Sequence, residues 1–143
     1  TAADAKKLGD SIPWDLGAHG PWHAFAYEKL FVANNAKYDS HADLRKALFE
    51  TAPLTLVEAS PHDRYWGVGL SIDDPRIQNR DEWPGENKFG QLLTKLRDQM
   101  MAHDIFAQEV EAINKERAVL KATAGKKRFL ENISPDVTPK RAL

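Results

Sequence analysis

The stretch from Leu54 to Gly90 constrains the fold more than any other part of the sequence, because it places acidic, aromatic and glycine residues in turns directly after a strand-like run. That run, Leu54 to Ala59, favours β-structure and alternates in part, so it predicts one short strand. The residues from Ile72 to Glu86 have the composition of a loop. The sequence therefore predicts a pocket for a flat, negatively charged ligand, formed by Glu58, Asp63, Trp66, Gly67, Gly69, Trp83, Gly85, Asn87 and Gly90.

Size and composition limit the function further. The chain has 143 residues, of which 42% are hydrophobic, so it can bury one ordinary core and is expected to form one domain. Its 20 basic and 21 acidic side chains give a formal net charge of −1, so any phosphate binding has to be local. The absence of cysteine excludes thiolate nucleophiles and favours an intracellular location, in a compartment that the sequence leaves open. No apolar run approaches the roughly 20 residues of a membrane span, and we expect no membrane partner.

Helical patterns lie on both sides of the central stretch. Apolar residues recur at three- and four-residue steps from Trp22 to Tyr38, and a second helix is predicted from about His41 to Glu50. A long helical pattern starts at Asn87 and is expected to continue as far as Leu120. Beyond Gly125, basic residues and two prolines predict a flexible tail.

Asp63 and Trp66 place a carboxylate beside a large aromatic wall. In a closed pocket such a carboxylate can hold a ribose hydroxyl, position a water molecule or stabilise an oxocarbenium-like centre, which is what cleavage of a glycosidic bond requires. Gly67 and Gly69 permit unusual backbone torsions, so their amides could face phosphate oxygens. The alternative is a tight turn before a packed strand, and these residues leave both interpretations open.

Asn87 and Lys37 are further candidates. Asn87 ends a WPGEN motif where a helix begins, so it either only caps that helix or helps the first amides to bind an anion. Lys37 lies among small and apolar residues; it is either a surface lysine that extends to solvent or an amine that binds phosphate or attacks a sugar carbon. The five histidines lack the spacing of metal ligands, so we expect no metal site.

Several short motifs follow one another in a fixed order. They are LG at Leu8, Trp22, KY at Lys37, L–T from Leu48 to Thr51, LVEAS–HD–YWGVGL from Leu56 to Leu70, WPGENKFGQLL from Trp83 to Leu93, and LRD from Leu96 to Asp98. This order and spacing resemble the NADAR domain family over about Ala2 to Arg97. The resemblance implies an N-glycosidase: some members resemble enzymes that hydrolyse the ribosylamino bond of riboflavin-pathway pyrimidine intermediates, and others remove ADP-ribose from modified bases, notably guanine in DNA.

The resemblance also implies a fold, a site and a division of the chain. The fold would be a compact, mostly helical α+β domain with a small sheet and a long C-terminal helix. Residues 1–103 would form the NADAR-like domain, 104–122 a helical extension and 123–143 a basic flexible tail. The ligand would be ADP-ribose-like, free or attached to nucleic acid, and no cofactor would be needed because water is the second substrate. Asp63 and Lys37 would be catalytic, and the substrate-binding residues would be Trp22, Trp66, Gly67, Gly69 and Asn87.

One part of the family pattern has no counterpart in this sequence. The N-terminal part of the family contains early strands and a short helix with a catalytic glutamate, and Glu28, Glu50 and Glu58 do not lie in that motif. Because the polar site residues are intact, we interpret this as a missing segment, removed or carried on another polypeptide, rather than decay, and we expect the chain alone to be catalytically silent. Two other classes stay open: a module that binds ADP-ribose without turnover, and a structural subunit anchored by the tail and the long C-terminal helix.

Overall fold

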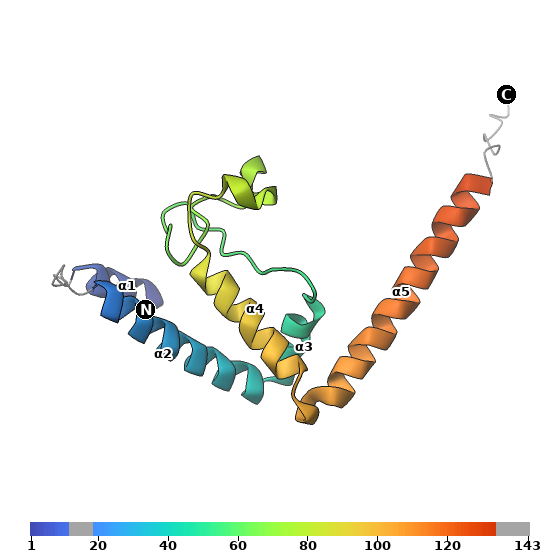
Figure 1. Ribbon diagram of the computed structural model, residues 1–143, viewed down its shortest axis with the longest axis horizontal. Helices are drawn as coiled ribbons and strands as arrows, with labels where there is room; N and C mark the ends of the chain where they lie inside the picture. Colours follow the sequence, from blue (N-terminus) through green and yellow to red (C-terminus); the bar gives the residue numbers. More distant parts are fainter. Residues whose placement is uncertain (12–18, 134–143) are drawn as a thin grey trace. The chain divides into compact units, whose positions relative to one another are not determined.

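The structure is a computed structural model that describes residues 1–11 and 19–133, and it consists of helices joined by irregular segments (Figure 1). The chain divides into two compact units, Thr1–Ser40 and His41–Leu143. The first contains α1 (Ala2–Ser11) and α2 (His19–Ser40). The second contains α3 (Ala42–Glu50), α4 (Lys88–Met101), α5 (Ala107–Ile133) and the short 3-10 helices η2 (Pro75–Gln78), η3 (Arg80–Glu82) and η4 (Asp104–Phe106). Among the described helices, none combines the length and the apolar character that crossing a membrane requires.

The first unit is dominated by α2, which covers the helix predicted from Trp22 to Tyr38. Its side-chain contacts below join residues that are close in the sequence. The rings of Trp22 and Phe25 lie 5.9 Å apart between centroids, and the buried Asn34 donates its side-chain amide to the Leu30 carbonyl at 2.8 Å. Such contacts join residues one helical turn apart, because those residues share a face of the helix.

The apolar core of the second unit is formed by α3, α4 and the chain around η4, together with Val68 and Leu70 of the loop and Ile113 of α5. Leu92, Leu96 and Met100 recur at four-residue steps on α4, which places them on one face, and each is at most 5% exposed. Phe49 of α3 packs edge-on against Phe106, with ring centroids 5.9 Å apart. Burial of each such side chain stabilises the fold by about 1.5–3 kcal/mol relative to leaving it exposed.

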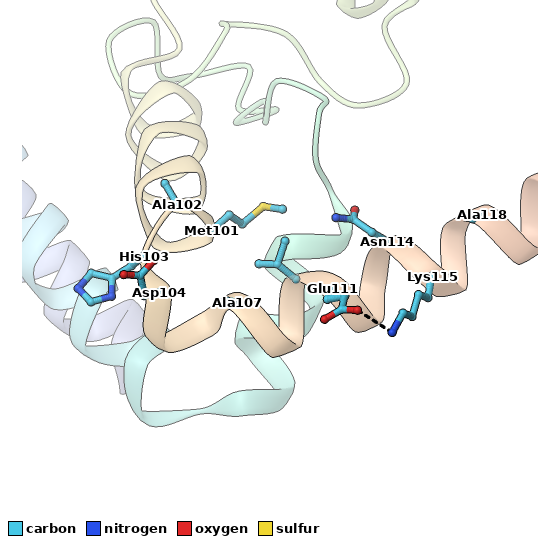
Figure 2. Close-up of a pocket in the computed structure, with 10 residues that line it drawn as sticks. Met101, Ala102, His103, Asp104, Ala107, Glu111, Asn114, Lys115 and Ala118 are labelled. Atoms are coloured by element: carbon cyan, nitrogen blue, oxygen red, sulfur yellow. Dashed lines mark ion pairs between the residues drawn. The ribbon is translucent and has the colours of Figure 1, made fainter.

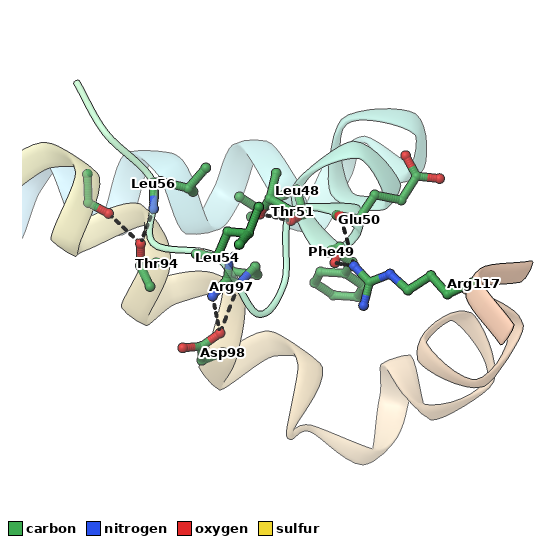
Figure 3. Close-up of polar contacts among 11 residues, drawn as sticks. Leu48, Phe49, Glu50, Thr51, Leu54, Leu56, Thr94, Arg97, Asp98 and Arg117 are labelled. Atoms are coloured by element: carbon green, nitrogen blue, oxygen red, sulfur yellow. Dashed lines mark hydrogen bonds and ion pairs between the residues drawn. The ribbon is translucent and has the colours of Figure 1, made fainter. Parts of the chain in front are cut away.

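Two arginines link α3 to α5. Arg45 donates from Nε and Nη2 to the two carboxylate oxygens of Glu109, at 2.9 and 2.7 Å. Arg117 donates from Nη2 to the main-chain oxygens of Phe49 and Glu50, at 3.0 and 2.8 Å, where α3 ends (Figure 3). Because the last carbonyls of a helix have no partner within that helix, Arg117 supplies one from outside.

The prediction of an α+β fold with a small sheet is wrong, because residues 1–11 and 19–133 contain helices and no strand. The expected strand, Leu54 to Ala59, has no regular secondary structure. Its backbone is paired with side chains of α4 instead of a second strand: the Leu56 N–H donates to Thr94 Oγ1 at 2.9 Å, and the Leu54 carbonyl accepts from Arg97 Nη1 at 2.6 Å (Figure 3). Residues that favour β-structure fit any half-buried surface, and here a helix provides it.

The helical pattern that starts at Asn87 is interrupted once. α4 ends at Met101, and η4 turns the chain before α5 begins at Ala107. α5 then runs to Ile133, so it includes the first part of the predicted tail, while residues 134–143 lie outside the described residues.

Candidate functional site

The predicted site residues are divided between the two units. Trp22 and Lys37 lie on α2 in the first unit, about 22 Å apart along its axis, because an α-helix rises about 1.5 Å per residue. The candidate site described next belongs to the second unit. It contains the other five residues, in the loop between α3 and α4 and at the start of α4: Asp63, Trp66, Gly67, Gly69 and Asn87.

Asp63 organises the turn that carries Trp66. Its Oδ1 accepts the backbone N–H groups of Tyr65 and Trp66, at 3.0 and 2.8 Å. The rings of Tyr65 and Trp66 meet edge-to-face, with centroids 4.9 Å apart. The Oδ2 atom accepts no hydrogen bond from the described residues, so one carboxylate oxygen shapes the turn and the other remains for a ligand.

Gly67 is required by close packing of the backbone on itself. A Cβ atom at this position would lie 2.8 Å from the Asp63 carbonyl oxygen and 2.9 Å from that of Glu58. Gly69 is required by conformation, because its φ of +73° lies in the left-handed region. Both observations agree with the tight-turn interpretation, in which the close approach involves the protein's own backbone.

Two backbone N–H groups of the same turn have no hydrogen-bond acceptor in the described part of the chain. The Val68 N–H donates to the Glu58 carbonyl, and the Gly85 N–H donates to the Val68 carbonyl, both at 2.9 Å. The N–H groups of Gly67 and Gly69 donate to nothing in the described part of the chain. Gly67 is buried and Gly69 is half-buried, so the Gly69 N–H is the more accessible of the two donors for a ligand anion.

Asn87 is a junction inside the site. It is 1% exposed and has a left-handed backbone, with φ 56° and ψ 39°. Its Nδ2 donates to the Leu56 carbonyl and its Oδ1 accepts the Glu58 N–H, both at 2.9 Å, while its own N–H donates to the Gly67 carbonyl at 3.0 Å. The side chain makes no capping bond to α4, so Asn87 holds three segments together rather than presenting its amide to a ligand.

The remaining aromatic and cationic candidates are placed as follows. Trp83 donates its indole N–H to the Ile77 carbonyl at 2.9 Å, which ties the loop around η2 and η3. Trp22 is 42% exposed. Lys37 is exposed, and its Nζ lies 4.3 Å from the centre of the Tyr38 ring.

Arg97 is a residue of this region that the sequence reasoning did not single out for a role. It is 1% exposed, and its Nη1 donates to Thr51 Oγ1 at 3.0 Å and to the Leu54 carbonyl at 2.6 Å. The sequence feature that could have indicated its burial is its position directly after Leu96, on the apolar face of α4. A charged residue on such a face is buried only when its donors are satisfied, and here they are.

Elsewhere, the described part of the second unit has a cavity of about 340 Å³ between α3 and α5 and two larger ones. The first of the larger two, of about 540 Å³, lies where η4 joins α4 to α5. Two of its lining residues, Glu111 and Lys115, form an ion pair with 2.7 Å between Oε1 and Nζ (Figure 2). The second, of about 620 Å³, runs along α4 and is lined by polar side chains that include Arg80 and Lys95. The described residues contain no cluster of three or more His, Asp or Glu side chains that could hold a metal ion.

Comparisons with known proteins agree with the motif order. The family model described as the NADAR domain matches residues 1–101. N-glycosidase R617 of Acanthamoeba polyphaga mimivirus is 36% identical over 78 residues, 54% of this chain and 46% of that protein. N-glycosidase YbiA of Escherichia coli (strain K12) is 35% identical over 79 residues, 55% of this chain and 42% of that protein. Riboflavin biosynthesis protein PYRR, chloroplastic, of Arabidopsis thaliana is 31% identical over 88 residues, 62% of this chain and 13% of that protein.

In each of these relatives the chain spans less than half of the relative's length. No solved structure matches the chain significantly.

Proposed function

The chain belongs to the NADAR domain family, and from this membership we propose that it forms the substrate-binding part of an N-glycosidase. The reaction is hydrolysis of the bond between a ribose carbon and a base nitrogen on a phosphate-bearing ligand. The observation that carries the proposal is the family match over residues 1–101, together with relatives that are named N-glycosidases.

The turn at Asp63 suits this chemistry. As the base departs, positive charge develops on the ribose, and the Asp63 carboxylate oxygen without an internal partner can stabilise that charge. Trp66 offers an aromatic face on which the base or the ribose can stack. The amides of Gly67 and Gly69 are donors for a phosphate oxygen.

Asn87 and Lys37 receive different roles in this proposal. Asn87 acts as a positioning residue, because its bonds to Leu56, Glu58 and Gly67 fix the turn against the start of α4. Lys37 is either a phosphate ligand or a transient nucleophile; in the second case its amine replaces the base at the sugar carbon, and water then releases the sugar. Trp22 lies about 22 Å from Lys37 along α2, so in this proposal its ring stacks on a part of an extended ligand that is remote from the group Lys37 contacts.

The substrate that we propose is ADP-ribose attached to guanine in nucleic acid. The alternative is a ribosylamino-pyrimidine phosphate of the riboflavin pathway, which is favoured by the similarity to the relative named PYRR. Both substrates contain a ribose-to-base bond and a phosphate, so the same groups on the turn at Asp63 serve either one. They differ in the base that is released, which makes them distinguishable by product.

We also propose that a further polypeptide segment supplies a glutamate that handles protons. The departing base needs a proton, and general acid–base help typically contributes about 10² to 10⁴ in rate. The turn at Asp63 offers one carboxylate, which this proposal uses for charge stabilisation. Without such a segment, the same turn would bind ADP-ribose without turnover.

Release of free base from both substrate classes tests the proposed function. The complete gene product that contains this chain is incubated with an oligonucleotide carrying ADP-ribosylguanine, or with a ribosylamino-pyrimidine phosphate, and the products are separated by liquid chromatography with mass detection. We expect base release from one of them, and a rate about 10²-fold lower in Asp63→Asn, because the charge support is lost.

The matched control is Asp73→Asn, which removes an exposed carboxylate from the same loop and should keep the wild-type rate. The proposal fails if neither substrate loses its base. It also fails in its assignment of Asp63 if both variants react at the wild-type rate.

A further inference from the structure

A groove that contains several polar side chains runs along one face of α4, and none of the predicted site residues lines it. It is a shallow depression of about 620 Å³ that is largely open to solvent. Thr55 and Arg80 contribute from the preceding loop and η3. Five residues of α4, spaced so that they share one face of the helix, form its floor: Gln91, Thr94, Lys95, Asp98 and Gln99.

Asp98, the carboxylate that lines the groove, already pairs with an arginine of the same chain. Asp98 Oδ1 accepts a hydrogen bond from Nε of the buried Arg97 and forms an ion pair with its Nη2, each at 2.8 Å (Figure 3). This contact balances one positive and one negative charge. The net charge that the groove presents therefore comes from Arg80 and Lys95, two cations whose side chains pair with no carboxylate in the described part of the chain.

Other cations nearby behave differently. Arg76 Nη2 lies 2.6 Å from Asp74 Oδ2, and this contact lowers the pKa of Asp74 below its ordinary value, mainly through the side-chain hydrogen bond from Arg76. Lys88 Nζ lies 3.1 Å from Glu86 Oε2. Arg76 and Lys88 are thus neutralised by carboxylates of the same chain. Arg80 and Lys95 of the groove are not, so they can pair with an external anion.

We propose that the groove binds the diphosphate of a nucleotide-sized ligand through Arg80 and Lys95. A guanidinium presents a planar set of donors that matches phosphate oxygens, and a lysine adds a compact positive charge. The side chain of Gln99 has no internal partner and can bond to the sugar or the base. Because both cations are exposed, water weakens each contact, and the site is expected to bind with modest affinity that falls with salt.

Binding in the groove can be measured without turnover, so it stands apart from the proposed reaction. The probe is ADP, titrated into the isotope-labelled chain while the backbone amide signals are followed by NMR. We expect saturable shifts at Arg80, Lys95 and Gln99. Shifts confined to residues 66–69 would place the nucleotide at the predicted site and would overturn the groove.

Paired variants give the second readout. The double variant Arg80→Gln/Lys95→Gln should bind ADP about five- to tenfold more weakly, since two exposed charge contacts are lost. Arg76→Gln/Lys88→Gln removes the same two charge types where each is already paired, and it should bind as the wild type does. Equal weakening by both pairs, no effect of the first pair, or binding of a dT oligonucleotide without binding of ADP would each overturn the proposal. If the double variant misfolds, Lys95→Gln alone is measured instead. It should also weaken ADP binding, by a smaller factor.

Discussion

Two interfaces of the second unit are built from different interactions. Where α3 meets the chain around η4 and α5, the aromatic rings of Phe49 and Phe106 pack together, and Arg45 pairs with Glu109 beside them. Where the loop meets α4, the contacts around Asn87 are hydrogen bonds between side chains and backbone. The first interface depends on volume and charge, whereas the second depends on the positions of individual atoms.

This difference predicts how each interface responds to substitution. An apolar contact that is lost leaves other contacts in place, and a partly exposed ion pair is replaced in part by water. A buried amide that is lost leaves its backbone partners without hydrogen bonds, which costs about 1–3 kcal/mol for each group. The first interface is therefore expected to respond to loss of apolar volume, and the interface between the loop and α4 to loss of single hydrogen-bonding groups.

Asn87→Ala should produce the largest effect. It removes the partners of the Leu56 carbonyl and the Glu58 N–H and places alanine in a left-handed conformation, so we expect the free energy of unfolding to fall by about 2–4 kcal/mol. Urea denaturation followed by circular dichroism measures it. The control is Asn79→Ala, which removes an exposed cap of η3 and should cost about 0.5–1 kcal/mol. Equal losses in the two variants would remove the distinction between the interfaces.

Trp66→Ala tests whether the loop serves a ligand as well as the fold. Loss of one stacking surface should weaken the binding of ADP-ribose by about 1–3 kcal/mol in calorimetry. Trp83→Phe is the comparison, because Trp83 bonds to the Ile77 carbonyl and would lose only that internal contact. If Trp66→Ala binds as tightly as the wild type, the ring of Trp66 has a structural role only.

Local features of the sequence predicted the helices well. The helices α2 and α3 followed from apolar periodicity and from breaks in that periodicity, which are properties of neighbouring residues. The strand prediction failed because the partner of an extended segment is a tertiary property, and α4 supplied that partner through Thr94 and Arg97. Asn87 was predicted either to cap α4 or to help its first amides bind an anion, yet its side chain bonds to residues about 30 positions earlier in the chain.

Parts of the site also depend on contacts that no short pattern encodes. The groove along α4 joins Arg80 and Lys95, which lie in different elements and share no motif. Arg97 falls on an apolar stripe, where a charged residue is ordinarily assigned to solvent. In both cases the decisive quantity is whether a charged group has a partner, and partners are known only after the chain has folded.

Glu109→Gln should produce the smallest effect, and one that depends on pH. The side-chain hydrogen bonds from Arg45 lower the pKa of Glu109 below its ordinary value of 4.5. A carboxyl whose pKa is depressed in the folded state contributes stability above its unfolded pKa and loses that contribution as the pH falls through the folded pKa. Because the Glu109 side chain is 38% exposed and water screens the pair, we expect the variant to lose only about 0.5–1 kcal/mol near pH 7.

The gap between Glu109→Gln and the wild type should close as the pH falls below 4.5, where the wild-type carboxyl becomes protonated. Urea denaturation at neutral and acidic pH measures the gap. Glu111→Gln provides the matched control, because Glu111 pairs with Lys115 within one exposed helix, where such pairs contribute about 0.2–0.5 kcal/mol. A gap for Glu109→Gln that persists in acid would show that the charge of the Arg45–Glu109 pair does not account for the lost stability.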